Sequence, residues 1–213
     1  QRSSYTSSDL SGVLSFGRFN YKIEFLDSNN ILEKILKKGG TIMDKLPSVY
    51  HGIIHRSLLK KIFLHFGSYF PGPSPDMANA IALIKFISNF TYVDFPVVIS
   101  GKCNKSTGGQ GIDHLHVASI EDTLHLPKDI LKHWDNNIPK YWTAPTIWAQ
   151  TLRQTLDKAD LNLSSTKLDY LYLYAYIYVY NSKNSNEIFK NFNVPFKSNF
   201  FFYFHIIKIL LER

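Results

Sequence analysis

The sequence predicts a helix-rich α/β protein with a few strands. Apolar residues recur every three or four positions, the period of an amphipathic helix, in four segments: 31–36, 58–63, 77–84 and 147–156. A fifth segment, 92–101, is apolar, contains a proline near its start and closes on a glycine, as a buried strand does. With 213 residues, of which 45% are hydrophobic, the chain is long enough to enclose one sizeable core.

The N-terminal region begins without a clear period and then contains two predicted helices. Residues 1–20 are expected to form a loop or a displaced strand. Asp27 and the polar residues after it are typical of a helix start, and the pair Gly39-Gly40 is expected to end that helix. Residues 46–56 are predicted to be extended and to lead into a second helix, with Ser57 as candidate cap and a buried face of Leu58, Leu59, Ile62 and Phe63.

A proline-rich loop brings one carboxylate to the start of a third helix. Pro71, Pro73 and Pro75 each fix φ, and Pro75 also biases Ser74 away from helical geometry, so the loop is stiff up to the helix. Asp76 then lies in the first turn. There a carboxylate either accepts backbone N–H bonds and complements the helix dipole or is positioned as a general base. The cap is the commoner role, and the two roles are compatible.

A loop rich in glycine, serine and lysine follows the predicted strand, over residues 101–111. Its lysine–serine pair lacks the preceding glycines of a Walker A motif, so that motif is excluded. We expect either an exposed surface loop or a mobile active-site loop that meets phosphate through its lysines and backbone amides. The candidate phosphate-binding residues are Lys102, Lys105, Ser106, Gly108 and Gly109.

Histidines and acids are concentrated between residues 113 and 125. Three histidines, among them His116, and three acids fall within this segment. Imidazole and carboxylate groups suit a divalent metal, whereas such residues on a loop are often only solvated. His51 and His55 form a separate pair of histidines. For this pair, partly buried or hydrogen-bonded side chains are favoured over metal ligation, because no HExxH pattern accompanies them.

Aromatic residues dominate the C-terminal part of the chain. Trp134 and Trp142 are expected in the core, with stacking on a sugar as the alternative. Helices are predicted to begin at 126–129 and to run over 146–159. In 170–180 every second residue is tyrosine, which favours a strand, although a buried helix is also compatible. Residues 200–211 predict an amphipathic helix, too short to span a bilayer, that packs on the protein or on a membrane surface.

Charge and cysteine content limit the partners and the compartment. Lys and Arg total 24 against 17 Asp and Glu, and the net charge of +7 favours an anionic partner. Nucleic acid is the least favoured anion, because no arginine-rich arm, zinc-finger or homeodomain pattern is present. The single cysteine, Cys103, excludes an intramolecular disulfide and fits the cytoplasm. We therefore expect a cytoplasmic protein, with peripheral contact at the inner face of the membrane.

Short motifs follow one another in a fixed order between residues 45 and 158. They are Val49-Tyr50-His51-Gly52 with Arg56, then Tyr69-Phe70-Pro71-Gly72-Pro73-Ser74-Pro75-Asp76, then Pro96-Val97-Val98-Ile99-Ser100-Gly101 with 106–109, and finally His116-Val117-Ala118-Ser119-Ile120-Glu121-Asp122 leading to Leu126-Pro127-Lys128-Asp129, Trp134 and Ile138-Pro139. This series resembles the C-terminal half of family 2 glycosyltransferases, GT-A enzymes that build bacterial surface polysaccharides. No single motif is specific, and the resemblance rests on their order.

The resemblance implies an inverting transfer from a nucleotide-diphosphate sugar to a hydroxyl of a saccharide or lipid-linked acceptor. In the family a divalent ion, Mn or Mg, is held by an Asp-x-Asp motif, and a carboxylate deprotonates the acceptor. Asp76 matches that base. By the same resemblance, His116 would reach the diphosphate or the metal, the loop that follows Gly101 would close over the donor, and the acceptor contacts would be Ser74, Trp134 and Trp142.

The departures from the family matter as much as the matches. No Asp-x-Asp occurs in these residues, and no segment of alternating strands and helices with a uridine-binding acid precedes them. The expectation is therefore a partial GT-A fold without its nucleotide-binding half, inactive alone. Residues 1–160 would be its acceptor side and 161–213 an aromatic, helical extension. Two other classes stay open: a carbohydrate- or membrane-surface-binding module without catalysis, and a metal-dependent nuclease that uses the acids and histidines of 114–122.

Overall fold

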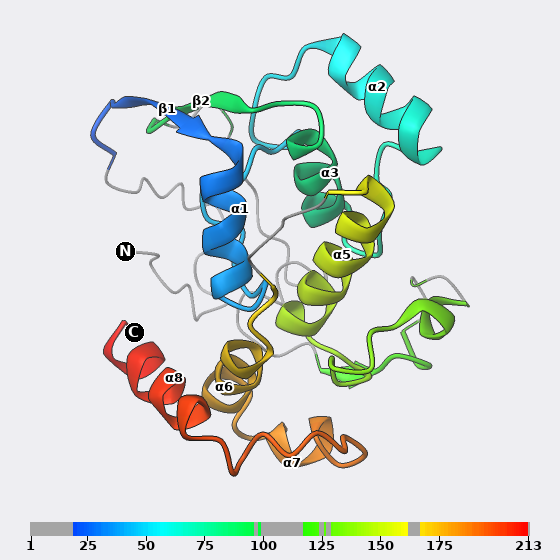
Figure 1. The fold of residues 1–213 in the computed structure, drawn as a ribbon, viewed down its shortest axis with the longest axis vertical. Coiled ribbons are helices and arrows are strands. Elements are labelled where there is room, and N and C mark those ends of the chain that lie inside the picture. Colours follow the sequence, from blue (N-terminus) through cyan, green and yellow to red (C-terminus); the bar gives the residue numbers. More distant parts are fainter. Residues whose placement is uncertain are drawn as a thin grey trace, which may run out of the picture.

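The computed structural model describes residues 19–95, 98, 117–123, 126, 129–161 and 167–212. Within these ranges the protein has seven α-helices and two antiparallel sheets of two strands each (Figure 1). The predicted helix-rich α/β class is confirmed at this level. Predictions for residues 1–18 and for the loop over 101–111 lie outside the described residues.

The first sheet pairs β1 (Ile23–Asp27) with β2 (Asn89–Val93). Ile23 lies opposite Val93, and Asp27 lies opposite Asn89. Of the strand predicted over 92–101, only Tyr92 and Val93 belong to β2, which begins earlier than predicted, and residues 96, 97 and 99–101 lie outside the described residues. The pairing with β1 sets where β2 begins and ends. A proline has no backbone N–H to donate to a strand partner.

Helix α1 (Ser28–Lys37) follows β1 directly and begins and ends as predicted. The Asp27 carboxylate accepts a hydrogen bond from the backbone N–H of Asn30 at 2.8 Å. Gly39 and Gly40 follow with φ of +61° and +68°. A Cβ on Gly39 would lie only 2.7 Å from the backbone nitrogen of Leu173, so this glycine also allows close packing against a later helix.

Helix α2 (Arg56–Phe66) lies at the edge of the fold. Its N-cap is His55, whose ring nitrogen accepts from the backbone N–H of Ser57, so the predicted Ser57 cap is wrong by two residues. Ile62 is fully buried against α3, but Phe63 is 45% exposed. The predicted four-residue buried face is narrower in the structure because α2 touches the body of the protein along one row only.

Helix α3 (Pro75–Ile84) is the centre of the fold, and every residue from Met77 to Ile84 is buried. It packs against α1, α2 and the long helix α5 (Ala144–Ala159). Helix α5 begins with a reciprocal capping box between Thr143 and Thr146, and the predicted helix over 146–159 is confirmed.

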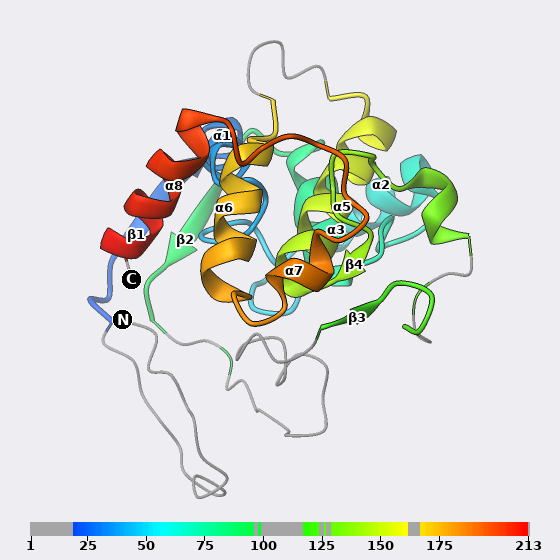
Figure 2. The same cartoon turned by 90° about the horizontal axis from the view of Figure 1, so that it is seen from below.

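The C-terminal part consists of α6 (Tyr170–Tyr180), the short α7 (Ser185–Ile188) and α8 (Phe200–Leu211), with α8 packed against α6 (Figure 2). The tyrosine-rich segment is a helix, not a strand. A helix of these residues is apolar or aromatic on every side, and α6 buries Tyr172 to Ala175 and Ile177 where it packs against α5 and α8. Asp169 caps α6 by accepting from the backbone N–H of Tyr172 at 2.9 Å.

The second sheet pairs β3 (Ala118–Ser119) with β4 (Tyr141–Trp142), and a 3-10 helix (Ile130–His133) lies between them in sequence. The helix start predicted at 126–129 is thus met by a single 3-10 turn with Asp129 at its N-cap. No helix in the described ranges is long and apolar enough to cross a bilayer.

Candidate functional site

The proline-rich loop before α3 is held to the body of the protein by three hydrogen bonds. The buried amide of Asn79 donates to the Tyr69 carbonyl at 2.9 Å, and Lys158 Nζ donates to the Pro71 carbonyl at 3.1 Å. The backbone N–H of Ser74 donates to the Thr151 hydroxyl at 2.9 Å. Helices α3 and α5 thus clamp a loop that its prolines already stiffen, so the start of α3 has a defined position.

Asp76 stands in the first turn of α3 and is an exposed residue. The N-cap position is Ser74, which makes no side-chain capping bond, and no hydrogen bond of the Asp76 side chain is formed to any described residue. Partial burial raises the pKa of Asp76 above its ordinary value, and the charge of His51 opposes that shift. The Asp76 carboxylate therefore makes no helix-capping hydrogen bond to a described residue, and its raised pKa makes it a stronger base than an ordinary aspartate.

Two aromatic pairs line the chain beside this loop. Tyr50 and Phe70 stack with their ring planes 9° apart and their centroids at 5.9 Å. Phe63 of α2 packs on Tyr69 at 4.9 Å. These contacts bring the segment around His51, which precedes α2, to the start of α3, although the two are separated in the sequence. His51 is exposed, and it lies close enough to Asp76 to act on the pKa of that carboxyl.

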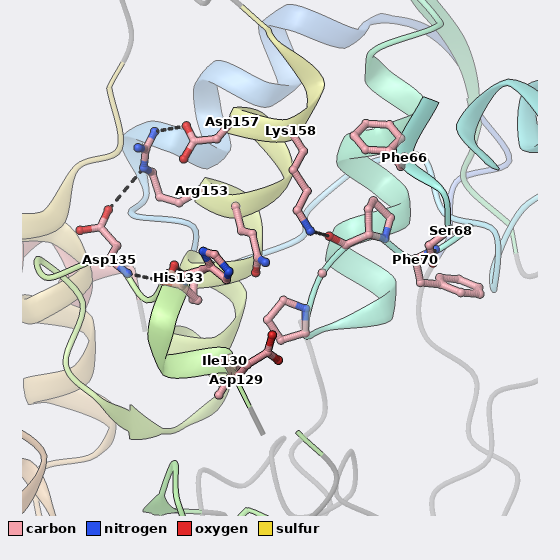
Figure 3. Close-up of a pocket in the computed structure, with 15 residues that line it drawn as sticks. Phe66, Ser68, Phe70, Asp129, Ile130, His133, Asp135, Arg153, Asp157 and Lys158 are labelled. Carbon is pink, nitrogen blue, oxygen red and sulfur yellow. Dashed lines mark hydrogen bonds and ion pairs between the residues drawn. The ribbon is translucent and has the colours of Figure 1, made fainter. Parts of the chain in front are cut away.

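A cavity of about 690 Å³ is lined in part by the same loop (Figure 3). One side consists of Phe66 and the loop residues 68 and 70–73, and the opposite side is the C-terminal half of α5 together with the 3-10 helix. Asp76 does not line it. The polar lining residues carry charges of both signs, two amides and one hydroxyl: Ser68, Asp129, His133, Asp135, Gln150, Arg153, Gln154, Asp157 and Lys158.

The charges of the cavity wall are largely paired with one another. Arg153 lies between the carboxylates of Asp135, at 3.3 Å, and Asp157, at 3.1 Å (Figure 3). The Tyr170 hydroxyl donates to the same Asp135 oxygen at 2.5 Å, and the backbone N–H of Asn137 donates to the other at 2.8 Å. A wall of paired charges, amides and phenyl rings suits a neutral polar ligand better than a phosphate.

The Asp135 carboxylate binds groups from three segments of the chain, at Asn137, Arg153 and Tyr170, and these bonds affect its pKa. Burial acts to raise the pKa of Asp135, but the bonds from Tyr170, Asn137 and Arg153 together outweigh burial and hold that pKa below its ordinary value. Burial raises the pKa of the Tyr170 hydroxyl well above its usual range, and the hydrogen bond to Asp135 raises it further. Gln150 completes the node by accepting from the Asp135 backbone N–H and donating to the His133 carbonyl, both at 2.9 Å.

The remaining candidate residues are distributed differently from the sequence-based expectation. Trp134 and Trp142 are each 6% exposed and belong to the core, where the Trp134 indole donates to the Ile138 carbonyl at 2.9 Å. The core role is thus the one seen, and as placed neither indole offers a free face to a sugar. The donor-loop candidates and His116 lie outside the described residues: Lys102, Lys105, Ser106, Gly108, Gly109 and His116.

A metal site is not assembled by the residues that the structure describes. No group of three or more His, Cys, Asp or Glu side chains comes together among them. Glu121 is described, and a hydrogen bond from the Ser119 hydroxyl lowers the pKa of its carboxyl. The hydrogen-bonded role predicted for His55 is confirmed, since its ring nitrogen lies 2.8 Å from the Ser57 hydroxyl.

Sequence reasoning missed the residues that hold the site in place. Thr151 and Lys158 lie within a helix that was predicted correctly, but nothing in their spacing indicates that they bind a loop about 80 residues earlier. Asp135, Arg153 and Tyr170 likewise come from separate segments. The only available signal was a buried face of α5 that contains threonine and glutamine at apolar positions.

Taken together, the described residues define a helix-rich α/β protein with an available carboxylate at a helix start and an adjacent polar cavity. The sequence matches no known protein-family model, and searches of curated proteins and of solved structures give no match either.

Proposed function

We propose that this chain forms the acceptor side of an inverting glycosyltransferase and that Asp76 is the general base. The observation that carries the proposal is the state of Asp76: a carboxylate at the end of a clamped proline loop, not engaged as a helix cap, with its pKa raised by partial burial. The order of motifs that resembles family 2 glycosyltransferases supports the same role.

In the proposed reaction the acceptor hydroxyl attacks the anomeric carbon of a nucleotide-diphosphate sugar. As the new C–O bond forms, the hydroxyl proton passes to Asp76, and the bond to the diphosphate breaks to release the nucleoside diphosphate. A raised pKa makes the carboxylate a stronger base than an ordinary aspartate, and a fixed backbone keeps it within reach of the proton.

The cavity beside the loop supports a hydroxyl-rich acceptor. Residues 70–73 form one of its walls, and Ser74, Pro75 and Asp76 follow them immediately. Phenyl rings can cover the apolar face of a sugar, while amide and carboxylate groups accept and donate to its hydroxyls. An acceptor chain longer than one sugar would thus occupy the cavity and extend toward the carboxylate.

The test is acceptor-dependent release of nucleoside diphosphate by the protein encoded by the entire reading frame that contains these residues. Purified protein is offered a panel of nucleotide-diphosphate sugars with polysaccharide oligomers as acceptors. Asp76→Asn should lower the turnover number by about 10²- to 10⁴-fold, the usual contribution of a general base. Asp27→Asn is the matched control: it makes the same chemical change at another helix start, where asparagine caps equally well.

Equal turnover in wild type and Asp76→Asn would refute the role of Asp76. No acceptor-dependent release with any donor, together with retention on the oligomers that Asp76→Asn leaves unchanged, would instead identify a carbohydrate-binding module without catalysis.

A further inference from the structure

The outer face of the C-terminal helix α8 carries an apolar stripe that no described part of the protein covers. Phe200, Phe204, Ile207 and Leu211 follow the spacing i, i+4, i+7 and i+11, so they lie in one row along the helix. Their exposed fractions are 77%, 52%, 59% and 83%. Tyr203 and Leu210 flank this row and are about half exposed.

The inner face of α8 is firmly packed, so the outward direction of the stripe is determined by the fold. Phe202 and Ile209 are each 2% exposed. Phe202 packs on Phe196 with ring centroids 5.0 Å apart, and the His205 ring lies 3.2 Å from the Asp169 carboxylate. A helix fixed by one apolar face and showing a second one to solvent has a surface for something else to cover.

The charge around the stripe is basic. Between residues 183 and 212 the cations are Lys183, Lys190, Lys197 and Lys208, and the acids are Glu187 and Glu212. Glu212 pairs with Lys38 at 3.3 Å, whereas Glu187 accepts from the neutral Tyr141 hydroxyl at 2.5 Å and keeps its charge. The four lysines form no ion pair with any other described residue. Lys208 lies on α8 itself, four residues after Phe204 and three before Leu211, so an anionic surface would meet positive charge beside the apolar row.

The size of the stripe argues against a second copy of the chain as its partner. A helix of 12 residues is about 18 Å long. Pairing two such rows would bury on the order of several hundred Å², whereas a stable protein interface needs roughly 1,200 Å² or more. A bilayer surface has no such minimum, because each inserted side chain contributes independently and basic residues add attraction to anionic lipid.

We propose that α8 lies flat on an anionic lipid bilayer. The row of Phe200, Phe204, Ile207 and Leu211 enters the boundary between headgroups and acyl chains, Tyr203 sits at headgroup level, and the neighbouring lysines contact lipid phosphates. This role does not rest on the proposed sugar transfer.

Vesicle flotation of the purified 213-residue chain tests it. Vesicles of phosphatidylcholine alone are compared with vesicles of phosphatidylcholine and phosphatidylglycerol in equal parts. We expect wild-type protein to float with the anionic vesicles and to do so far less with the neutral ones. Phe204→Ser combined with Ile207→Ser should weaken anionic binding by at least roughly tenfold. Leu64→Ser is the matched control, because Leu64 is 73% exposed on α2, away from the stripe.

Far-ultraviolet circular dichroism verifies that the exposed substitutions leave the helices intact. A second variant, Lys197→Gln with Lys208→Gln, should reduce binding to anionic vesicles while leaving the weak neutral binding unchanged. The proposal is overturned if wild type does not float with anionic vesicles, or if the stripe variant binds as well as wild type does. It is also overturned if sedimentation shows that the stripe instead holds two copies together in the absence of vesicles.

Discussion

Removing the Thr151 hydroxyl should loosen the loop that carries Asp76 while leaving the core filled. Thr151 is fully buried; its hydroxyl accepts from the Ser74 backbone N–H at 2.9 Å and donates to the Ile147 carbonyl at 2.7 Å. Thr151→Val replaces this hydroxyl with a methyl group of similar volume. The Ile147 carbonyl keeps its helical partner, so the main loss is the acceptor of Ser74.

The expected cost follows from the burial of that donor. A buried donor left without an acceptor costs about 1–3 kcal/mol, and Ser74 is half-buried, which places the loss at about 1–2 kcal/mol. Urea unfolding followed by tryptophan fluorescence measures this change in the free energy of unfolding. Hydrogen exchange measured on the intact protein should show the Ser74 amide exchanging about five- to thirtyfold faster, because 1.4 kcal/mol corresponds to a factor of ten.

Thr151→Ser separates the hydrogen bond from the packing. It keeps the hydroxyl and removes the methyl group, so the Ser74 amide should stay protected even if a small cavity lowers stability. The reasoning would be refuted if Thr151→Val left Ser74 exchange unchanged, or if Thr151→Ser accelerated it equally.

Three further predictions address charge and space around the site. The folded-state pKa of Asp76 is raised above its ordinary value of 3.8, so the folded state binds more protons than the unfolded state and loses stability as the pH rises from 3.8 through the folded-state pKa. Asp76→Asn should therefore raise the melting temperature slightly at neutral pH. An unchanged or lower melting temperature would contradict this. The folded-state pKa of Asp135 is lowered, so the stability that its carboxylate contributes is present above the unfolded value of 3.8 and is lost as the pH falls through the folded-state pKa. Asp135→Ala leaves the Tyr170 hydroxyl without its acceptor and should lower the free energy of unfolding in urea by about 2–3 kcal/mol at neutral pH and by less in acid. A difference that does not change with pH would refute the lowered pKa of Asp135. Gly72→Ala would place a Cβ 2.8 Å from the Thr151 methyl and should lower the free energy of unfolding by about 1–3 kcal/mol. At Gly67 an added Cβ meets no atom within 4 Å, but φ is +69°, so Gly67→Ala should lower it by about 1 kcal/mol through backbone strain alone. Equal urea midpoints for the two variants would show that space at Gly72 is not limiting.

Local features of the sequence predicted much of the helical framework. The cap at Asp27 and the glycine stop at Gly39 were confirmed because both effects act within a few residues. The helix start at Asp76 was predictable for the same reason: prolines fix their own backbone angles wherever they occur. Helix α5 was predictable because its apolar period is long and regular.

Interactions between distant segments decided the rest. Alternating tyrosines favour a strand locally, yet 170–180 is a helix that packs against α5 and α8 and buries Tyr172 to Ala175 and Ile177, since burial outweighs intrinsic strand preference. Asp76 was identified as a candidate from the sequence, but only the fold shows that it makes no capping bond among the described residues and that Thr151 and Lys158 hold its loop. Such contacts join residues about 80 positions apart, and no local pattern encodes them. The sequence by itself determined where the helices after Asp27 and Ser74 begin and which residues can do chemistry, whereas tertiary packing decided which of those residues are buried or held in place.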